Sequence, residues 1–214
     1  MKIKEKKTQL MKFNFSKAHD FTPEFNIEGF TANIEVVNEA KILGIILTDD
    51  LRWEANTQYI CSKAYKRMWI LRRMKKLDVE PLILLDIYIK EIRSVLELAV
   101  PAWHSGLTKK QSADIERVQK VAFSIILGDS TRESQYSYDM ALVIFGLEPL
   151  YIRRDKLCMK FAKMTLKSRH SDMFNMKNNL YNTRHKSRFE TTSCNTNRYF
   201  NSPLNYLTRL LNHQ

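Results

Sequence analysis

The sequence predicts an α+β protein that is mostly α-helical, in which a short antiparallel β-hairpin layer precedes a helical bundle and a basic C-terminal arm. The 214 residues include only 5 glycines and 5 prolines, too few for a turn-rich all-β protein. Apolar and polar residues alternate before residue 50, whereas from about Trp53 the apolar residues recur at helical spacing. A hydrophobic content of 44% also supports a buried core.

Extended segments are predicted over residues 9–15, 24–28, 33–37 and 41–47. The last is an apolar, β-branched run typical of a buried strand, and its Gly44 indicates a bulge or a close backbone approach. Asp49 and Asp50 follow this strand. Paired aspartates can hold two metal ions in polymerases. Here a helix follows the pair and no third carboxylate lies on an earlier strand, so helix capping is the favoured interpretation.

The helix predicted over residues 54–77 has two different faces. Its apolar face consists of Ile60, Ala64, Met68, Leu71 and Met74. Its other face is basic and carries one aromatic residue: Lys63, Lys66, Trp69, Arg72, Arg73 and Lys76. Lysine and arginine bind phosphates without regard to sequence, and an aromatic ring beside them can stack on a base. Packing of Trp69 against a neighbouring helix is an equally good interpretation.

Further helices are predicted over residues 81–98, 109–127, 138–145, 149–169 and 203–211. Pro101 is expected to stop the first of these, Thr108 to cap the next, and Gly128 and Gly146 to end helices. The helix over 149–169 places Leu157, Phe161 and Leu166 among basic residues. Its candidate nucleic-acid contacts are Arg153, Arg154, Lys160, Lys163 and Lys167. Residues 171–200, rich in Asn, Thr, Ser and Arg, are predicted to form a loose basic arm.

The positive charge is concentrated in two segments. Of the net charge of +12, residues 51–100 carry +4 and residues 151–214 carry +10. Clustered positive charge favours a polyanion such as nucleic acid, or an acidic membrane surface, although a merely basic soluble surface is also compatible with it. No run approaches the roughly 18 apolar residues of a membrane span, and the basic start is not a signal peptide.

The three cysteines form no C-x-x-C pair, which indicates free thiols in a reducing compartment. A zinc site built from Cys158, His170, His185 and Cys194 is conceivable but disfavoured by the spacing. No nucleophile motif and no glycine-rich phosphate loop is visible, and the polar residues around His104 are expected to cap a helix junction. These observations predict a protein without its own catalytic or metal site.

An ordered series of motifs resembles the C-terminal part of non-LTR (LINE-like) retrotransposon reverse transcriptases. Residues 4–13, KEKKTQLMKF, resemble the N-x-x-K-T-x-x-M-x-F stretch that follows the catalytic aspartates of that family. Residues 40–53, AKILGIILTDDLRW, are similar to its K-x-L-G-v-x-l-d-x-x-L-x-W pattern. Residues 92–97 with 101–103, IRSVLE and PAW, and residues 115–122, IERVQKVA, match later patterns, as do 157–163 and 207–212. Ser94 and Leu98 depart from the family's frequent proline and aromatic residues.

The resemblance covers nearly the whole chain and implies three domains: a palm remnant over residues 1–50, a helical thumb over 51–148, and a basic region over 149–214. It implies that Ile42, Leu43 and Gly44 belong to the primer grip and that Lys7 assists proton transfer. RNA template and DNA primer are the implied partners, together with missing polymerase and endonuclease regions. Magnesium is implied for the full-length enzyme but not for this chain, because the catalytic aspartates would precede Met1.

We therefore expect a nucleic-acid-binding fragment of an RNA-directed DNA polymerase that is inactive by itself and intracellular, in the nucleus or in a cytoplasmic ribonucleoprotein. Two alternatives remain. One is a decayed or repurposed helical interaction module without a catalytic or nucleic-acid role. The other is a peripheral membrane protein.

Overall fold

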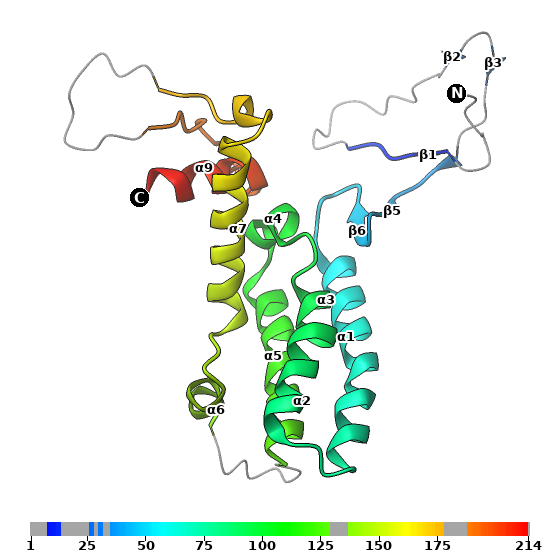
Figure 1. Cartoon of the computed structure of the whole chain (residues 1–214). Coiled ribbons are helices and arrows are strands. Elements are labelled where there is room, and N and C mark those ends of the chain that lie inside the picture. Colours follow the sequence, from blue (N-terminus) through cyan, green and yellow to red (C-terminus); the bar gives the residue numbers. More distant parts are fainter. Residues whose placement is uncertain are drawn as a thin grey trace. The chain divides into compact units, whose positions relative to one another are not determined.

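The computed structural model describes residues 8–13, 26–27, 30–31, 35–128, 137–177 and 188–213 (Figure 1). The protein is α+β and mostly helical, with short strands before residue 50 and helices after it, which confirms the predicted fold class. The chain divides into two compact units, Met1–Tyr59 and Ile60–Gln214. The helices on both sides of residue 148 lie in the second unit, and the division of the helical part at that residue stays a prediction.

Three pairs of short strands occur in the described part of the first unit. Strand β1 (Gln9–Leu10) is parallel to β4 (Glu35–Val36), and β2 (Asn26–Ile27) is antiparallel to β3 (Phe30–Thr31). Strands β5 (Glu39–Ile42) and β6 (Ile45–Thr48) form an antiparallel hairpin in which Ile42 is opposite Ile45. The expected hairpin is therefore present, whereas the parallel pair was not expected.

The interpretation of residues 41–47 as one buried strand is wrong. A two-residue turn at Leu43 and Gly44 divides the run, and both residues have positive φ, 49° and 91°. Two residues with positive φ in succession are typical of a type I′ hairpin turn, which matches the natural twist of the strands. The Leu43 side chain is 93% exposed at this tip.

The hairpin is attached to the first turns of helix α1 (Glu54–Lys75) within the first unit. Lys41 Nζ donates to the Tyr59 hydroxyl at 2.7 Å, and the Ile46 backbone N–H donates to Asn56 Oδ1 at 3.1 Å. Asp50 Oδ1 accepts hydrogen bonds from Thr48 Oγ1 and the Arg52 N–H. Asp50 thus stabilises the turn that precedes α1.

The second unit contains most of the helices. Besides the continuation of α1, its described residues form α2 (Pro81–Ile87), the π-helical η2 (Tyr88–Arg93), α3 (Ser94–Leu96), α4 (Val100–Trp103), α5 (Lys109–Leu127), α6 (Tyr138–Phe145), α7 (Leu150–Leu166), α8 (Asn197–Phe200) and α9 (Pro203–Asn212), with short 3-10 turns at His104–Gly106 and Ser171–Met173. Helices α2, η2 and α3 follow one another without a break and form one helical run over residues 81–96, where a helix was predicted over 81–98 (Figure 1).

The apolar spacing of α1 and α5 correctly identified their buried faces. Ile60, Ala64, Met68 and Leu71 of α1 are at most 1% exposed, and Ile115, Val118, Ala122 and Ile126 of α5 are fully buried. A capping box begins α5, because Thr108 Oγ1 accepts from the Gln111 N–H and Gln111 Oε1 accepts from the Thr108 N–H. Gly128 and Gly146 end α5 and α6 with positive φ, as predicted.

Pro101 starts a helix, although the sequence predicted that it would stop one. Ala99 takes a left-handed conformation, with φ of 50°, directly before α4, and Pro101 lies in the first turn of that helix. A proline is well accommodated there because the first turn needs no backbone N–H donor. The preceding helical run ends because of the reversal at Ala99.

Part of the predicted loose arm is packed. Phe174 and Phe189 are at most 4% exposed, and their rings meet edge to face at 6.0 Å between centroids. The Asn212 side chain of α9 accepts from the Phe189 N–H and donates to the Phe189 carbonyl oxygen. The prediction of a loose arm is therefore wrong at Phe174 and Phe189, whereas residues 178–187 lie outside the described part of the chain.

The buried face of helix α7 is not formed by Leu157, Phe161 and Leu166, the apolar residues that the sequence places among its basic side chains. Its buried residues are Leu150, Arg154, Cys158, Ala162 and Thr165. Phe161 is 44% exposed, and Leu157 and Leu166 are only half-buried.

Within the described residues, no helix has the length and hydropathy that crossing a membrane requires.

Candidate nucleic-acid interface

The basic face predicted on α1 is exposed. Trp69 is 63% exposed, and Lys66, Arg72, Arg73 and Lys76 are also exposed, while Lys63 is half-buried. The opposite face of the same helix fills the core, so packing fixes which side of α1 faces solvent. The interpretation of Trp69 as a residue packed against a neighbouring helix is therefore wrong for the described part of the chain.

The positive charge on this face is not neutralised locally. Glu54 is the only acidic residue in α1. Lys66, Arg72, Arg73 and Lys76 form no ion pair with any acidic residue that the structure describes. Like charges three or four residues apart on a helix repel each other, as Arg72 and Lys76 do. A bound polyanion would relieve this repulsion.

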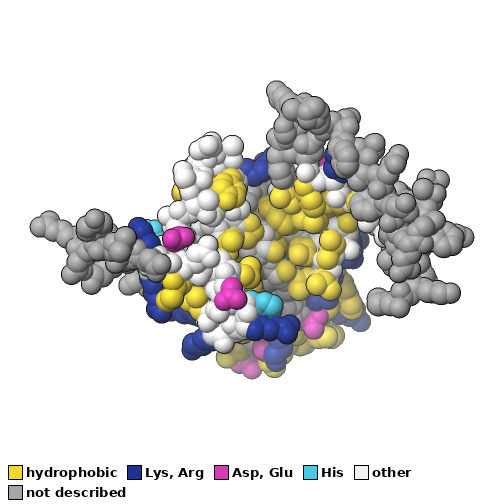
Figure 2. Space-filling model, turned by 90° about the horizontal axis from the view of Figure 1, so that it is seen from above, with side chains coloured by type: hydrophobic (Ala, Val, Ile, Leu, Met, Phe, Trp, Pro, Cys, Tyr) yellow, Lys and Arg dark blue, Asp and Glu magenta, His cyan; other side chains and the backbone are white. Residues whose placement is uncertain are grey.

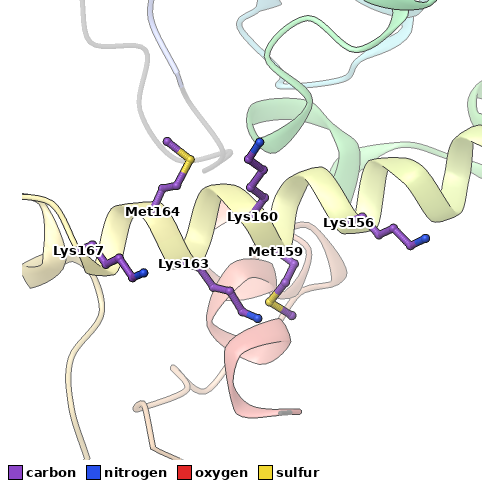
Figure 3. A pocket seen from close by; sticks show the side chains of 6 residues that line it. All are labelled: Lys156, Met159, Lys160, Lys163, Met164 and Lys167. Carbon is purple, nitrogen blue, oxygen red and sulfur yellow. The ribbon is translucent and has the colours of Figure 1, made fainter.

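A second row of positive charge runs along α7. Lys160, Lys163 and Lys167 are exposed, and Lys156 is paired with the Glu148 carboxylate. Figure 3 shows Lys160 and Met164 on one side of the helix and Lys163 and Met159 on the other. The hollow of about 350 Å³ among these side chains is lined by α7 alone. Because no second element closes it, it is an open surface hollow and not an enclosed site for a small molecule.

Arg153 is engaged in an ion-pair cluster within the protein. Its Nε donates to Glu97 Oε1, its Nη2 donates to Glu97 Oε2 at 3.1 Å, and Arg93 Nε lies 3.3 Å from the same carboxylate. The side chains of Arg93 and Glu97 are 12% and 15% exposed. Glu97 therefore holds Arg153 in a bidentate pair that a phosphate would have to displace.

The prediction that Arg154 contacts nucleic acid is wrong. Arg154 is 1% exposed, and its Nε donates to His104 Nδ1 at 3.1 Å while its Nη2 donates to Ser112 Oγ at 2.6 Å. Burial lowers the pKa of this arginine, although nearby Glu116 and Asp155 oppose that effect. The guanidinium joins α7 to the start of α5 and to the turn at His104, and a phosphate cannot reach it in this conformation.

His104 is structural and has no ring nitrogen available for proton transfer. Because Arg154 Nε is a donor, His104 Nδ1 must accept and the ring proton must be on Nε2, which lies 2.7 Å from Asp155 Oδ1. Tyr206 of α9 also donates to Asp155 Oδ1. The helix-junction role expected for the residues around His104 agrees with these contacts.

Two of the cysteines, Cys61 and Cys158, are buried thiols. Burial raises the pKa of Cys61 to about 11 and that of Cys158 to about 12, so both thiols stay protonated at neutral pH. Within the described ranges, no group of three His, Cys, Asp or Glu side chains could hold a metal ion. His185 of the conceivable zinc site lies outside those ranges.

The residues implied as a primer grip lie at the tip of the β5–β6 hairpin. Ile42 is 49% exposed and Leu43 is 93% exposed, on either side of the positive-φ turn. Exposed apolar side chains at a hairpin tip can contact a ligand, but their exposure alone does not identify it. Lys7, the implied proton-transfer assistant, lies outside the described residues.

A buried polar network that the sequence did not predict connects α5, α6 and η2. Gln119 Oε1 accepts from the Tyr88 hydroxyl at 2.6 Å, and Gln119 Nε2 donates to the Tyr138 hydroxyl at 2.9 Å. Tyr138 in turn donates to Glu116 Oε1, which also accepts from the Leu150 N–H at 3.0 Å. The glutamate and glutamine of the IERVQKVA segment therefore stabilise the fold.

Comparison of the chain with protein-family models, with curated proteins and with solved structures gives no match. The resemblance to reverse transcriptases therefore rests on the ordered motifs of the sequence.

Proposed function

We propose that this chain is the C-terminal part of a non-LTR retrotransposon reverse transcriptase and that it binds primer–template nucleic acid through the basic face of α1. The observation that carries the proposal is the exposed group of Lys66, Trp69, Arg72, Arg73 and Lys76 on a helix whose other face is buried. This arrangement supplies several cations, which bind phosphates, beside one aromatic ring. The lysines of α7 provide a second candidate contact.

The proposal assigns no chemical step to this chain. Magnesium is implied for the complete enzyme, but Asp50 is engaged by Thr48 and Arg52, and a helix follows it closely. Asp49 and Asp50 therefore do not fit a two-metal site, and the chain's residues are assigned to binding alone.

Charge reversal of α1 tests the proposal. We expect the double substitution Lys66→Glu and Arg73→Glu to weaken binding of a fluorescein-labelled RNA–DNA primer–template with a template overhang by at least about tenfold, because two phosphate contacts become repulsive. The measurement is fluorescence anisotropy at several salt concentrations. For the unchanged protein, four phosphate contacts predict affinity on the order of 100-fold lower at 200 mM than at 50 mM salt.

The matched control is Lys109→Glu with Lys110→Glu, which changes the net charge equally at exposed positions on α5. Negative charge in the first turn of a helix is favourable, so this control should fold normally. We expect its affinity to change less than about threefold. Equal loss of affinity in both double variants, or no loss in either, would contradict the assignment of α1 as the interface.

A second candidate function, a helical protein-interaction module, is favoured by the exposed apolar residues of α6. Met140, Val143 and Ile144 are 53%, 81% and 51% exposed. For this alternative, the same anisotropy titration would detect no nucleic-acid binding even at low salt.

A further inference from the structure

Trp69 occupies the centre of the basic face, which defines what kind of nucleic acid the face fits. On a helix surface a residue contacts those three and four positions away. For Trp69 these neighbours are Tyr65, Lys66, Arg72 and Arg73, and each is aromatic or basic and exposed. From Lys66 to Lys76 the face extends for roughly 15 Å along the helix axis.

The ring of Trp69 is available for a ligand. It is 63% exposed, whereas the other two tryptophans, Trp53 and Trp103, are 8% and 0% exposed. Trp103 also donates its indole N–H to the Leu98 carbonyl oxygen at 2.8 Å, so it is fixed within the fold. Trp69 is thus the tryptophan that a ligand in solution can reach.

The combination of an open indole ring and unpaired cations selects among polyanions. Within a duplex each base stacks on its neighbours and exposes only its edges in the grooves, so an indole ring has no base face to contact. In a single strand the base faces are accessible, and stacking on an aromatic side chain stabilises the complex with any base. A membrane surface fits less well, because interfacial helices insert a broad apolar face and the apolar face of α1 is buried in the core.

We infer that the face formed by Lys66, Trp69, Arg72, Arg73 and Lys76 binds an unpaired stretch of nucleic acid, with one base stacked on Trp69 and the flanking phosphates held by the lysines and arginines. This inference rests on the proposed function and specifies its ligand as single-stranded rather than duplex. RNA and DNA share the required chemistry, so the experiment includes a strand of each.

Trp69→Ala tests this inference with three probes: a 12-nucleotide RNA, a DNA strand of the same sequence, and a blunt-ended duplex of two annealed strands. The loss of one stacked base is expected to lower the affinity for the single strands by about tenfold and that for the duplex by less than about threefold. Trp69→Phe retains an aromatic ring and should keep most of the affinity. Because Trp69 is exposed, its replacement should leave the fold intact, which circular dichroism verifies.

Intrinsic fluorescence provides a direct readout in the unchanged protein. Binding of either single strand should quench the fluorescence of the exposed tryptophan, whereas the Trp69→Phe variant should show no quenching because its remaining tryptophans are buried.

Two results would overturn the inference. One is that Trp69→Ala loses affinity equally for single strand and duplex. The other is the absence of quenching together with an unchanged affinity of Trp69→Ala. If Lys66→Glu with Arg73→Glu still weakens binding in that case, the proposed function stands and only the stacking role of Trp69 fails. If charge reversal also has no effect, the proposed function fails as well.

Discussion

Arg154 and Trp69 both differ from what their chemistry predicts. The charged Arg154 is buried, and the large aromatic Trp69 is exposed. Arg154 lies in the buried row of α7 between Leu150 and Cys158. Burial of a guanidinium is costly unless its N–H groups find acceptors. His104 and Ser112 accept from Nε and Nη2 of Arg154, whereas Nη1 has no hydrogen-bond partner in the described part of the chain. The identity of a residue therefore does not decide its role when the rotation of its helix is unknown.

Replacing Arg154 should destabilise the second unit. We expect Arg154→Ala to lower the free energy of unfolding by about 2–4 kcal/mol, because it leaves a cavity and removes the donors for His104 Nδ1 and Ser112 Oγ. Urea denaturation followed by circular dichroism measures the change. Lys160→Ala on the exposed face of α7 is the control and should change stability by less than about 0.5 kcal/mol. Similar stability of both variants would contradict the structural role of Arg154.

Leu43 is a residue in an unfavourable conformation. Its φ of 49° belongs to the left-handed region, which costs most L-residues roughly 1–2 kcal/mol and which asparagine or glycine normally occupies in a type I′ turn. An exposed leucine held there is more compatible with a contact role than with stability. The assignment of residues 42–44 to a primer grip rests on the family resemblance alone.

At the level of elements, α9 is held on α7 by a shared carboxylate. Asp155 of α7 accepts from Tyr206 of α9 and from His104 of the preceding turn. Burial by itself raises the pKa of Asp155, but the hydrogen bonds from His104 and Tyr206 outweigh that effect and hold its pKa below the ordinary value of 3.8. The ionised form of Asp155 is thus favoured by folding.

This direction of shift predicts how stability depends on pH. A carboxyl group with a lowered pKa in the folded state stabilises the fold above its unfolded pKa, and this contribution is lost as pH falls through the folded pKa. We expect Asp155→Asn to destabilise the protein at pH 5 and to differ less from the unchanged protein at pH 3, when both are compared by urea denaturation. Tyr206→Phe removes one of the two hydrogen-bond donors to Asp155, so it should reduce the pH-dependent stability that the Asp155 charge contributes. An equal difference at pH 5 and pH 3 would exclude this role of the Asp155 charge.

Helical elements were predicted well where apolar residues form most of the buried face. In α1 and α5 these residues recur at helical spacing, and burial of each contributes about 1.5–3 kcal/mol, so the pattern determines the rotation of the helix. In α7 the buried row contains arginine, cysteine, alanine and threonine, whose chemistry gives no such signal. Partners on α4, α5 and α9 fix its rotation instead.

For the molecule as a whole, the two basic segments are separate surfaces on α1 and α7, and their contributions to binding can be measured independently. We expect the triple substitution of Lys160, Lys163 and Lys167 by glutamate to reduce the slope of log affinity against log salt by about 2–3 if the α7 lysines contact phosphates as proposed. Salt titrations with the same primer–template provide the measurement. The slope of the control with Lys109→Glu and Lys110→Glu should be unchanged. An unchanged slope in the triple variant would restrict the interface to α1.

The sequence by itself determined the fold class, the approximate positions of the long helices, the caps at Thr108, Gly128 and Gly146, and the exposed basic face around Trp69. These features depend on local preferences and on periodic burial, which adjacent residues encode. Only the tertiary structure decided that Arg154 is buried, that Gln119 and Glu116 form an internal network, and that Phe174 and Phe189 pack together. Each of these depends on partners more than ten positions away in the chain, and such pairings arise when helices dock and cover one another's polar groups.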